Sequence, residues 1–228
     1  MILAVVGGKG GVGKSTVAYN LAAELDGVVV DADLAMADLP TGRGPDLHDV
    51  LAGRAAPVEA VREDGPVTVL PCGRSLAGAR ACDPTALVDA VEGVAGAYGS
   101  VVVDCPAGMC GDVGLGLLVA DACLLVTEPT PAALGDAVRA RALARELDAG
   151  LVAVALNRGT DDAPTGTIAD RLGAPVTVVP EDPDVARAQA AGQPVAAAAP
   201  DSRAATALAA LAETVERTTT PAARRFSS

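Results

Sequence analysis

The chain has few aromatic residues: its 228 residues include no Trp, one Phe and two Tyr. Half of the residues are nevertheless hydrophobic, and these are mainly Ala, Val and Leu. A core of small aliphatic side chains favours helices packed closely on a Val-rich parallel sheet. The length suits one sizeable α/β domain, so we expect a single domain over residues 1–217, followed by a flexible tail over 218–228.

The chain also lacks a long apolar run, and we expect no N-terminal leader. Met1 is followed directly by the apolar segment 2–6, without a basic region or a cleavage site, so we expect a cytoplasmic protein. The longest apolar stretch, 115–126, is interrupted by Asp121 and is too short to span a bilayer.

Basic residues are scarce relative to acidic ones: 17 Lys and Arg stand against 29 Asp and Glu, so the formal net charge is −12. This balance predicts a solvated acidic surface and argues against broad contact with nucleic acid. Scattered arginines such as Arg139, Arg141 and Arg145 share one helix face only in part. A DNA-binding partition scaffold is therefore an alternative rather than the expected function.

The five cysteines include no CxxC pair, which argues against a common metal-ligand motif. We interpret them first as small buried hydrophobic residues. A second interpretation stays open for Cys105 and Cys110, because two thiolates from each of two subunits could hold an iron–sulfur cluster. The single histidine, His48, is expected on the surface of a helix.

Short Val-rich runs alternate with helical stretches rich in Ala, Leu and Arg, which is typical of repeated βα units. The pattern predicts a three-layer α/β fold with a mostly parallel twisted sheet flanked by helices. The expected strands are 2–6, 28–31, 67–70, 101–104, 122–127, 151–156 and 176–179. The expected helices are 15–25, 46–53, 84–97, 113–120, 131–148, 164–172, 183–191 and 202–217.

The chain contains only two lysines, Lys9 and Lys14, and both lie in one glycine-rich segment, 7–16; the other fifteen basic residues are arginine. Within it, residues 8–15 match the phosphate-binding loop pattern GxxxxGK[ST] between an expected strand and an expected helix. Glycines allow successive backbone N–H groups to turn toward an anion, and the following helix adds its positive dipole end. The segment therefore predicts nucleotide binding.

Three side chains that close this loop have distinct expected roles. Lys14 would lie between the β- and γ-phosphates of ATP, and the Ser15 hydroxyl would ligate Mg²⁺. Thr16 is placed to donate a hydrogen bond to the α-phosphate.

Two near-identical runs, 28–31 and 101–104, each end in an aspartate. Ligands of parallel sheets bind beyond the carboxyl ends of the strands, so these carboxylates should face the glycine-rich loop. Asp104 is the expected metal-side carboxylate. Asp33 is the candidate catalytic residue that orients an attacking water, and it is also a candidate for the metal site. The alternative is that such aspartates only cap turns.

Residues 9–15 have the form KGGxGK[ST], and plain phosphate loops need no lysine at the position of Lys9. On this motif the chain resembles the MinD/ParA family of deviant Walker A (SIMIBI-type) P-loop ATPases, with MinD the most similar. Residues 30–33 look like the first switch of that family, and 104–108 like the second. Segments 156–158, 179–182 and 192–195 are similar to its adenine-side segments.

The resemblance implies the P-loop NTPase fold and ATP hydrolysis coupled to dimerisation, with two subunits enclosing two nucleotides. Lys9 would reach the phosphates of the partner, and Asp33 would position water. The remaining implied site residues hold the phosphates, the Mg²⁺ ion or the adenine: Gly8, Gly10, Gly11, Val12, Gly13, Lys14, Ser15, Thr16, Asp104, Asn157, Pro180 and Asp182.

Two features depart from the MinD pattern. Ala35 and Asp38 stand where Gly and Asn are usual, which puts the rate of hydrolysis in question. The tail contains Pro221 and a single Phe, so it offers little apolar face for a membrane, although membrane binding stays an alternative.

The expected function is an ATPase that positions or partitions division, chromosome or surface machinery. It would act as an ATP-dependent homodimer with an unidentified activator or cargo protein. A nucleotide-dependent iron–sulfur carrier of the same fold is the main alternative.

Overall fold

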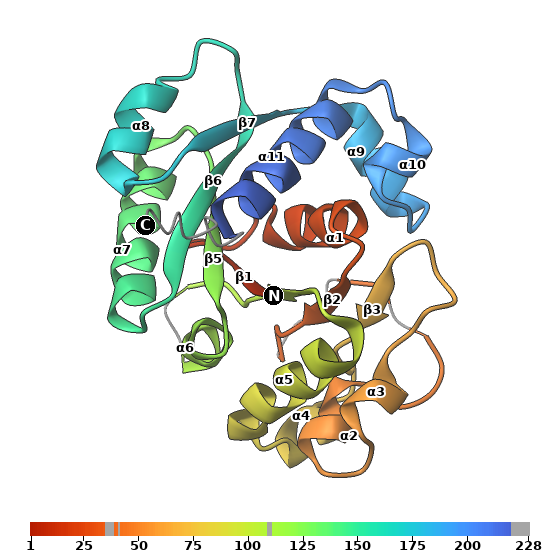
Figure 1. Ribbon diagram of the computed structural model, residues 1–228. Helices are drawn as coiled ribbons and strands as arrows, with labels where there is room; N and C mark the ends of the chain where they lie inside the picture. The colour runs from red at the N-terminus through yellow and green to blue at the C-terminus, as the bar shows by residue number, and fades with distance from the viewer. Residues whose placement is uncertain (35–38, 41, 109–110, 220–228) are drawn as a thin grey trace, which may run out of the picture.

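The computed structural model describes residues 1–34, 39–40, 42–108 and 111–219, and in it seven strands form one parallel sheet (Figure 1). The strand order is β3-β2-β4-β1-β5-β6-β7. Helices cover both faces, which confirms the three-layer α/β fold. The strands are β1 (Ile2–Val6), β2 (Val28–Asp31), β3 (Thr68–Leu70), β4 (Val101–Asp104), β5 (Ala122–Thr127), β6 (Gly150–Gly159) and β7 (Val176–Pro180).

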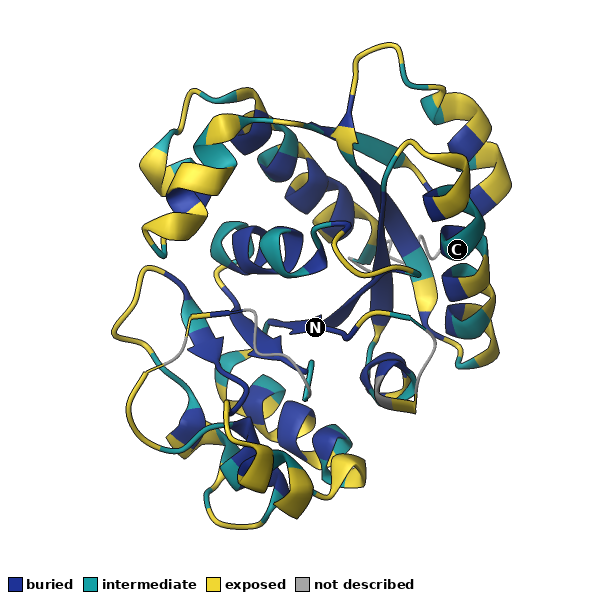
Figure 2. Ribbon diagram, turned by 180° about the vertical axis from the view of Figure 1, so that it is seen from behind, coloured by how far each residue is buried: buried dark blue, intermediate teal, exposed yellow. Residues whose placement is uncertain are grey.

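Alternate residues of each central strand feed two separate cores, as the pleat of a strand requires. In β1, Ile2, Ala4 and Val6 belong to one core, while Leu3 and Val5 belong to the other. Helices α5 (Leu87–Tyr98) and α7 (Pro131–Glu146) cover the first face, and α1 (Lys14–Glu24) and α11 (Arg203–Thr219) cover the second. The central strands are consequently buried throughout (Figure 2).

The remaining helices lie around this frame, and three of them were not predicted. The unpredicted ones have only four to six residues, which is too short for a periodic pattern to be read. They are α3 (Pro57–Ala60), α4 (Leu76–Ala81) and α10 (Val195–Ala198). The predicted ones are α2 (Leu47–Leu51), α6 (Gly111–Leu118), α8 (Thr165–Leu172) and α9 (Pro183–Ala190), and a 3-10 turn, η1 (Pro84–Ala86), precedes α5.

Strand β6 is longer at both ends than the sequence predicted, because it pairs with β5 on one side and β7 on the other. Helix α11 also continues two residues further than expected, to Thr219. Ala35, Asp38, Cys110 and the tail 220–228 lie outside the described residues. None of the described helices combines the length and the apolar character that a membrane-spanning segment requires.

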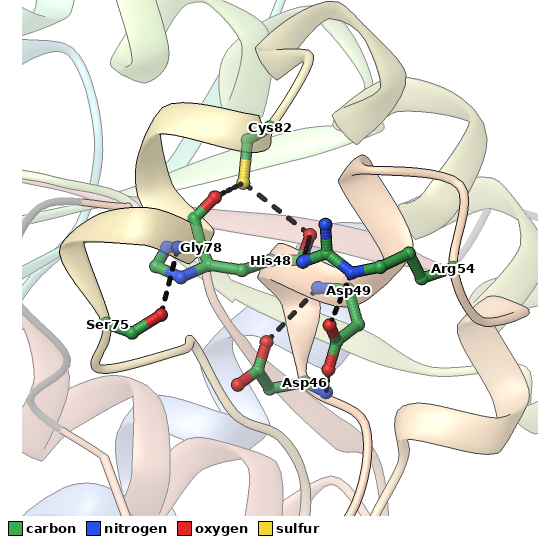
Figure 3. Close-up of polar contacts among 7 residues, drawn as sticks. All are labelled: Asp46, His48, Asp49, Arg54, Ser75, Gly78 and Cys82. Carbon is green, nitrogen blue, oxygen red and sulfur yellow. Dashed lines mark hydrogen bonds and ion pairs between the residues drawn. The ribbon is translucent and has the colours of Figure 1, made fainter.

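The expectation that His48 lies on the surface was wrong, because only 3% of this residue is exposed. The short helix α4 packs against α2 and covers the histidine. The His48 Nε2 atom lies 3.2 Å from the carbonyl oxygen of Leu34 and 3.4 Å from Cys72 Sγ. Figure 3 shows the Cys82 thiol on the same side of α2, where it donates hydrogen bonds to the carbonyl oxygens of His48 (3.7 Å) and Gly78 (3.2 Å).

Substitution of Gly73 by Ala tests the packing around His48. The new Cβ atom would lie 2.3 Å from His48 Nδ1 and 2.8 Å from Asp46 Oδ1, so the imidazole would have to move. We expect Gly73→Ala to lower the free energy of unfolding by about 1–3 kcal/mol in urea denaturation followed by circular dichroism.

The matched control is Gly96→Ala in α5, where an added Cβ meets no atom within 4 Å. Its free energy of unfolding should equal that of the wild type or exceed it by about 0.5–1 kcal/mol, because alanine favours a helix. Equal stability of the two variants would contradict the described packing.

Candidate functional site

The central strands β2 and β4 both end in buried aspartates, at the edge of the sheet where β1 leads into the glycine-rich loop. Asp31 of β2 lies in register with Asp104 of β4, and Asp104 lies in register with Val5 of β1. Both carboxylates are almost completely buried. Burial of charge is costly unless the charge is compensated, so this edge is suited to bind a cation.

The loop after β1 presents the N-terminus of α1 at the same edge. Gly11 and Gly13 have positive φ angles of 80° and 94°, which favour glycine. Gly13 is the N-cap of α1, and no side chain caps the helix there. The first N–H groups of an eleven-residue helix are therefore not used by a capping side chain and can donate to an anion.

The two lysines have opposite environments, although they are only five residues apart. Lys14 begins α1 and is buried, with 8% of its surface exposed. Lys9 lies exposed at the tip of the loop and makes no hydrogen bond or ion pair with any residue that the structure describes. The buried lysine packs beside Gly7 at the start of the loop, whereas the exposed one is available to another molecule.

Gly8 fixes the loop against helix α7. A Cβ atom at this position would lie 2.4 Å from both the Cβ atom and the backbone oxygen of Asp136. Because the clash involves backbone, a side chain at position 8 would push the loop away from the helix. Gly10 differs, since its nearest neighbour, the Cβ atom of Ala107, would be 3.7 Å away.

Asp31 organises the segment that carries Asp33. The Asp31 carboxylate accepts hydrogen bonds from the backbone N–H groups of Asp33 and Leu39, each over 3.3 Å. Asp33 itself is half-buried just beyond the end of β2. The buried aspartate thus holds the backbone on both sides of residues 34–38, a role that the sequence did not reveal.

The residues expected on the adenine side do come together. Asn157, Pro180 and Asp182 line a cavity of about 200 Å³ that also reaches Gly13 and Thr16. The Asn157 amide donates to the carbonyl oxygen of Val12 over 2.8 Å, so this side chain also contacts the loop. The Asp182 carboxylate caps α9 by accepting a hydrogen bond from the N–H of Asp184 over 2.9 Å.

A second cavity of about 330 Å³ adjoins the first and is lined in part by Ser15, Tyr19 and Arg74. The two cavities share Thr16 and Gln189, whose side chains are hydrogen-bonded over 3.3 Å. A larger cavity of about 800 Å³ lies at the amino ends of the strands and contains none of the expected site residues. Several of the residues expected to bind the nucleotide line the two smaller cavities, which surround the start of α1.

The described cysteines are mostly structural. Cys72, Cys105 and Cys123 are buried, and burial raises the pKa of the Cys123 thiol to about 12. A Cβ atom at Gly116 would lie 2.6 Å from Cys105 Sγ, so that thiol is closely packed. Within the described residues, no group of three or more His, Cys, Asp or Glu residues could hold a metal ion.

The residues at this edge fit a nucleotide with a magnesium ion. Backbone donors at an uncapped helix start and a buried ammonium group suit the phosphates. The Ser15 hydroxyl and the Asp104 carboxylate are oxygen donors of the kind that Mg²⁺ prefers. Gly10 and Gly11 leave open space on the loop that a larger residue would narrow.

Comparisons with known proteins agree with this geometry. A family model described as the CobQ/CobB/MinD/ParA nucleotide binding domain matches residues 3–195. An uncharacterised ATP-binding protein from Methanocaldococcus jannaschii is 35% identical over 222 residues, covering 90% of this chain and 84% of that protein. An iron–sulfur cluster carrier protein from Deinococcus radiodurans is 33% identical over 240 residues, covering 94% and 68%. Septum site-determining protein MinD from Pyrococcus horikoshii, solved as a complex with Mg-ADP, matches with a TM-score of 0.87 and 30% identity, covering 94% and 95%.

Substitution of Gly8 by Ala tests whether the seating of the loop on α7 is needed for binding. The clash with Asp136 displaces the loop, so we expect Mg-ADP to bind at least about tenfold more weakly in calorimetric titration, a loss of about 1.4 kcal/mol. The matched control is Gly135→Ala in α7, next to Asp136, where an added Cβ meets no atom within 4 Å. It should bind Mg-ADP as the wild type does. Wild-type affinity in Gly8→Ala would refute the claim that the seating of the loop on α7 is needed for nucleotide binding.

Proposed function

Because the chain belongs to the CobQ/CobB/MinD/ParA family of nucleotide-binding domains, we propose that it is an ATPase whose ATP-bound form pairs with a second copy of itself. The pair would recruit a partner protein, an activator or a cargo, and so position or partition cellular machinery. The observation that carries the proposal is the contrast between buried Lys14 and exposed Lys9. A nucleotide site formed by one subunit alone would need Lys14 but not Lys9.

In the proposed site, the phosphates lie over residues 8–13 and the start of α1. Lys14 neutralises charge between the β- and γ-phosphates, and Thr16 donates to the α-phosphate. The Ser15 hydroxyl and the carboxylates of Asp33 and Asp104 would hold a Mg²⁺ ion. This ion would offset negative charge on the phosphate oxygens. Asn157, Pro180 and Asp182 surround the adenine, in the cavity that they line.

Hydrolysis needs a water molecule held in line with the γ-phosphate, and Asp33 is the proposed residue for this task. Its position is set by the hydrogen bond from its backbone to the buried Asp31 carboxylate. Lys9 from the facing copy would stabilise the charge that develops on the phosphate. Pairing and hydrolysis are therefore coupled, and the paired state ends when ATP is consumed.

The setting and partners of the proposed ATPase follow from its charge and substrate. ATP as substrate implies a cytoplasmic location, and a net charge of −12 favours a protein partner over nucleic acid. The proposed active unit is the single domain expected over residues 1–217, although its last helix, α11, continues to Thr219. Membrane attachment is not part of the proposal, because the tail sequence offers little apolar surface.

An iron–sulfur carrier is the second candidate, since one relative bears that name. The environment of Cys105 does not favour it here, because this residue is 1% exposed and its thiol is closely packed against Gly116. Protein purified without oxygen should therefore be colourless. Visible absorption bands that disappear in a Cys105→Ala variant would support the carrier instead.

Size-exclusion chromatography with light scattering, in ATP and Mg²⁺, tests the proposed function. The wild type should form a dimer that returns to monomer as ATP is consumed. Asp33→Ala should remain a dimer, because water is no longer positioned. Lys9→Ala should bind ATP but stay monomeric and hydrolyse it at least about tenfold more slowly.

The control for lost positive charge is Arg171→Ala, which removes an exposed cation from α8. It should behave as the wild type. Dimer formation and full activity in Lys9→Ala would exclude the pairing mechanism.

A further inference from the structure

The end of strand β6 holds the glycine-rich loop through two side chains that also line the cavity reaching Gly13 and Thr16. Two consecutive side chains donate hydrogen bonds to two consecutive loop carbonyl groups. Asn157 donates from Nδ2 to the oxygen of Val12 over 2.8 Å, and Arg158 donates from its guanidinium to the oxygen of Gly11 over 3.0 Å. Segment 156–158 was expected on the adenine side, but Arg158 had no individual role there.

The backbone at Arg158 is shaped for this contact. Its φ angle is +54°, in the left-handed region that residues other than Gly, Asn and Asp seldom adopt. The pairing of β6 with β7 shifts register between Asn157 and Gly159, so Arg158 forms a bulge. Such strain persists where the surrounding contacts determine the conformation, and it often marks a functional position.

The carboxyl end of strand β5 holds the guanidinium group of Arg158 in place. Arg158 pairs with the carboxylate of Glu128, which directly follows β5. The Glu128 side chain is only 19% exposed, whereas that of Arg158 is 49% exposed. A guanidinium can serve a carboxylate and a carbonyl group at once, which the compact ammonium of lysine does less well. The contact therefore ties β5, β6 and the loop together.

The chemistry of a phosphate loop explains why its carbonyl groups need such partners. Its N–H groups must point to the anion, so the intervening carbonyl oxygens must point away. Gly11 has no side chain and a φ angle of +80°, so its backbone has more conformational freedom than that of a residue with a Cβ atom. A carbonyl oxygen rotated into the site would repel phosphate.

We propose that Arg158, held by Glu128, is a positioning residue that keeps the Gly11 carbonyl turned outward and the loop open to phosphate. The inference rests on the proposed function, because it assigns a role within the same nucleotide site. Gly11 lies two residues from Lys9, so the contact also steadies the part of the loop that would meet the second copy.

The test is the affinity for Mg-ADP, measured by calorimetry, in a series of variants at position 158. Asn tolerates the left-handed backbone but cannot reach Gly11, so Arg158→Asn removes the side chain without new strain. We expect it to bind Mg-ADP about tenfold more weakly than the wild type. Arg158→Lys should restore part of the affinity, and Glu128→Gln should lose about threefold.

Two further measurements separate positioning from a structural role. The midpoint of urea unfolding should stay unchanged in Arg158→Asn, because an exposed ion pair adds little to stability. Arg203→Ala, which removes an exposed arginine paired with Asp161, should keep wild-type affinity. Wild-type affinity in Arg158→Asn, or weak binding that accompanies a lower urea midpoint, would overturn the proposal. If Arg158→Asn fails to fold, Glu128→Gln decides in its place.

The outcome also distinguishes this inference from the proposed function. If the wild type binds no Mg-ADP, the proposed function itself is wrong. If the wild type binds and all position-158 variants bind equally well, only the positioning role is wrong.

Discussion

The candidate site depends on hydrogen bonds that occupy the carbonyl groups of its glycine-rich loop. A loop can offer its N–H groups to phosphate only if its carbonyl groups have partners elsewhere, and the end of β6 supplies two of these through Asn157 and Arg158. The other contacts follow the same arrangement: Gly8 seats the loop on α7, and Asp31 holds the backbone of Asp33 and Leu39. The site is thus built by elements from most of the sheet.

Much of the fold could be predicted from the sequence because its elements are long enough to show a pattern. Strands buried on both faces read as runs of Val, and α11 shows its apolar residues with a helical period. Helices α3, α4 and α10 could not be found in this way, since each spans about one turn. They form through local signals, such as Pro57 at the first position of α3 and the Ser75 side chain that caps α4.

The residues of the candidate site likewise fall into those that the sequence reveals and those that it does not. Loop glycines, lysines and strand-end aspartates are visible in the sequence because their residue types carry the chemistry at a fixed spacing. Glu128 and Gln189 are not visible, and neither is the contact of Arg158 with the loop, because each role depends on a partner distant in the chain. His48 was misplaced for the same reason: α4, which covers it, lies about thirty residues further along the chain.

The scarcity of aromatic residues has one practical consequence. With no Trp and a single, weakly absorbing Phe in the chain, most near-ultraviolet absorption and intrinsic emission come from two tyrosines. Tyr98 bonds to Glu63 on the outer layer, whereas Tyr19 is buried beside Ser15 and donates to the carbonyl oxygen of Gly192 over 2.8 Å. Burial raises the pKa of this second phenol, so it stays protonated in ordinary buffers. The molecule therefore carries a native chromophore in the middle of α1, on the wall of the cavity that Ser15 also lines.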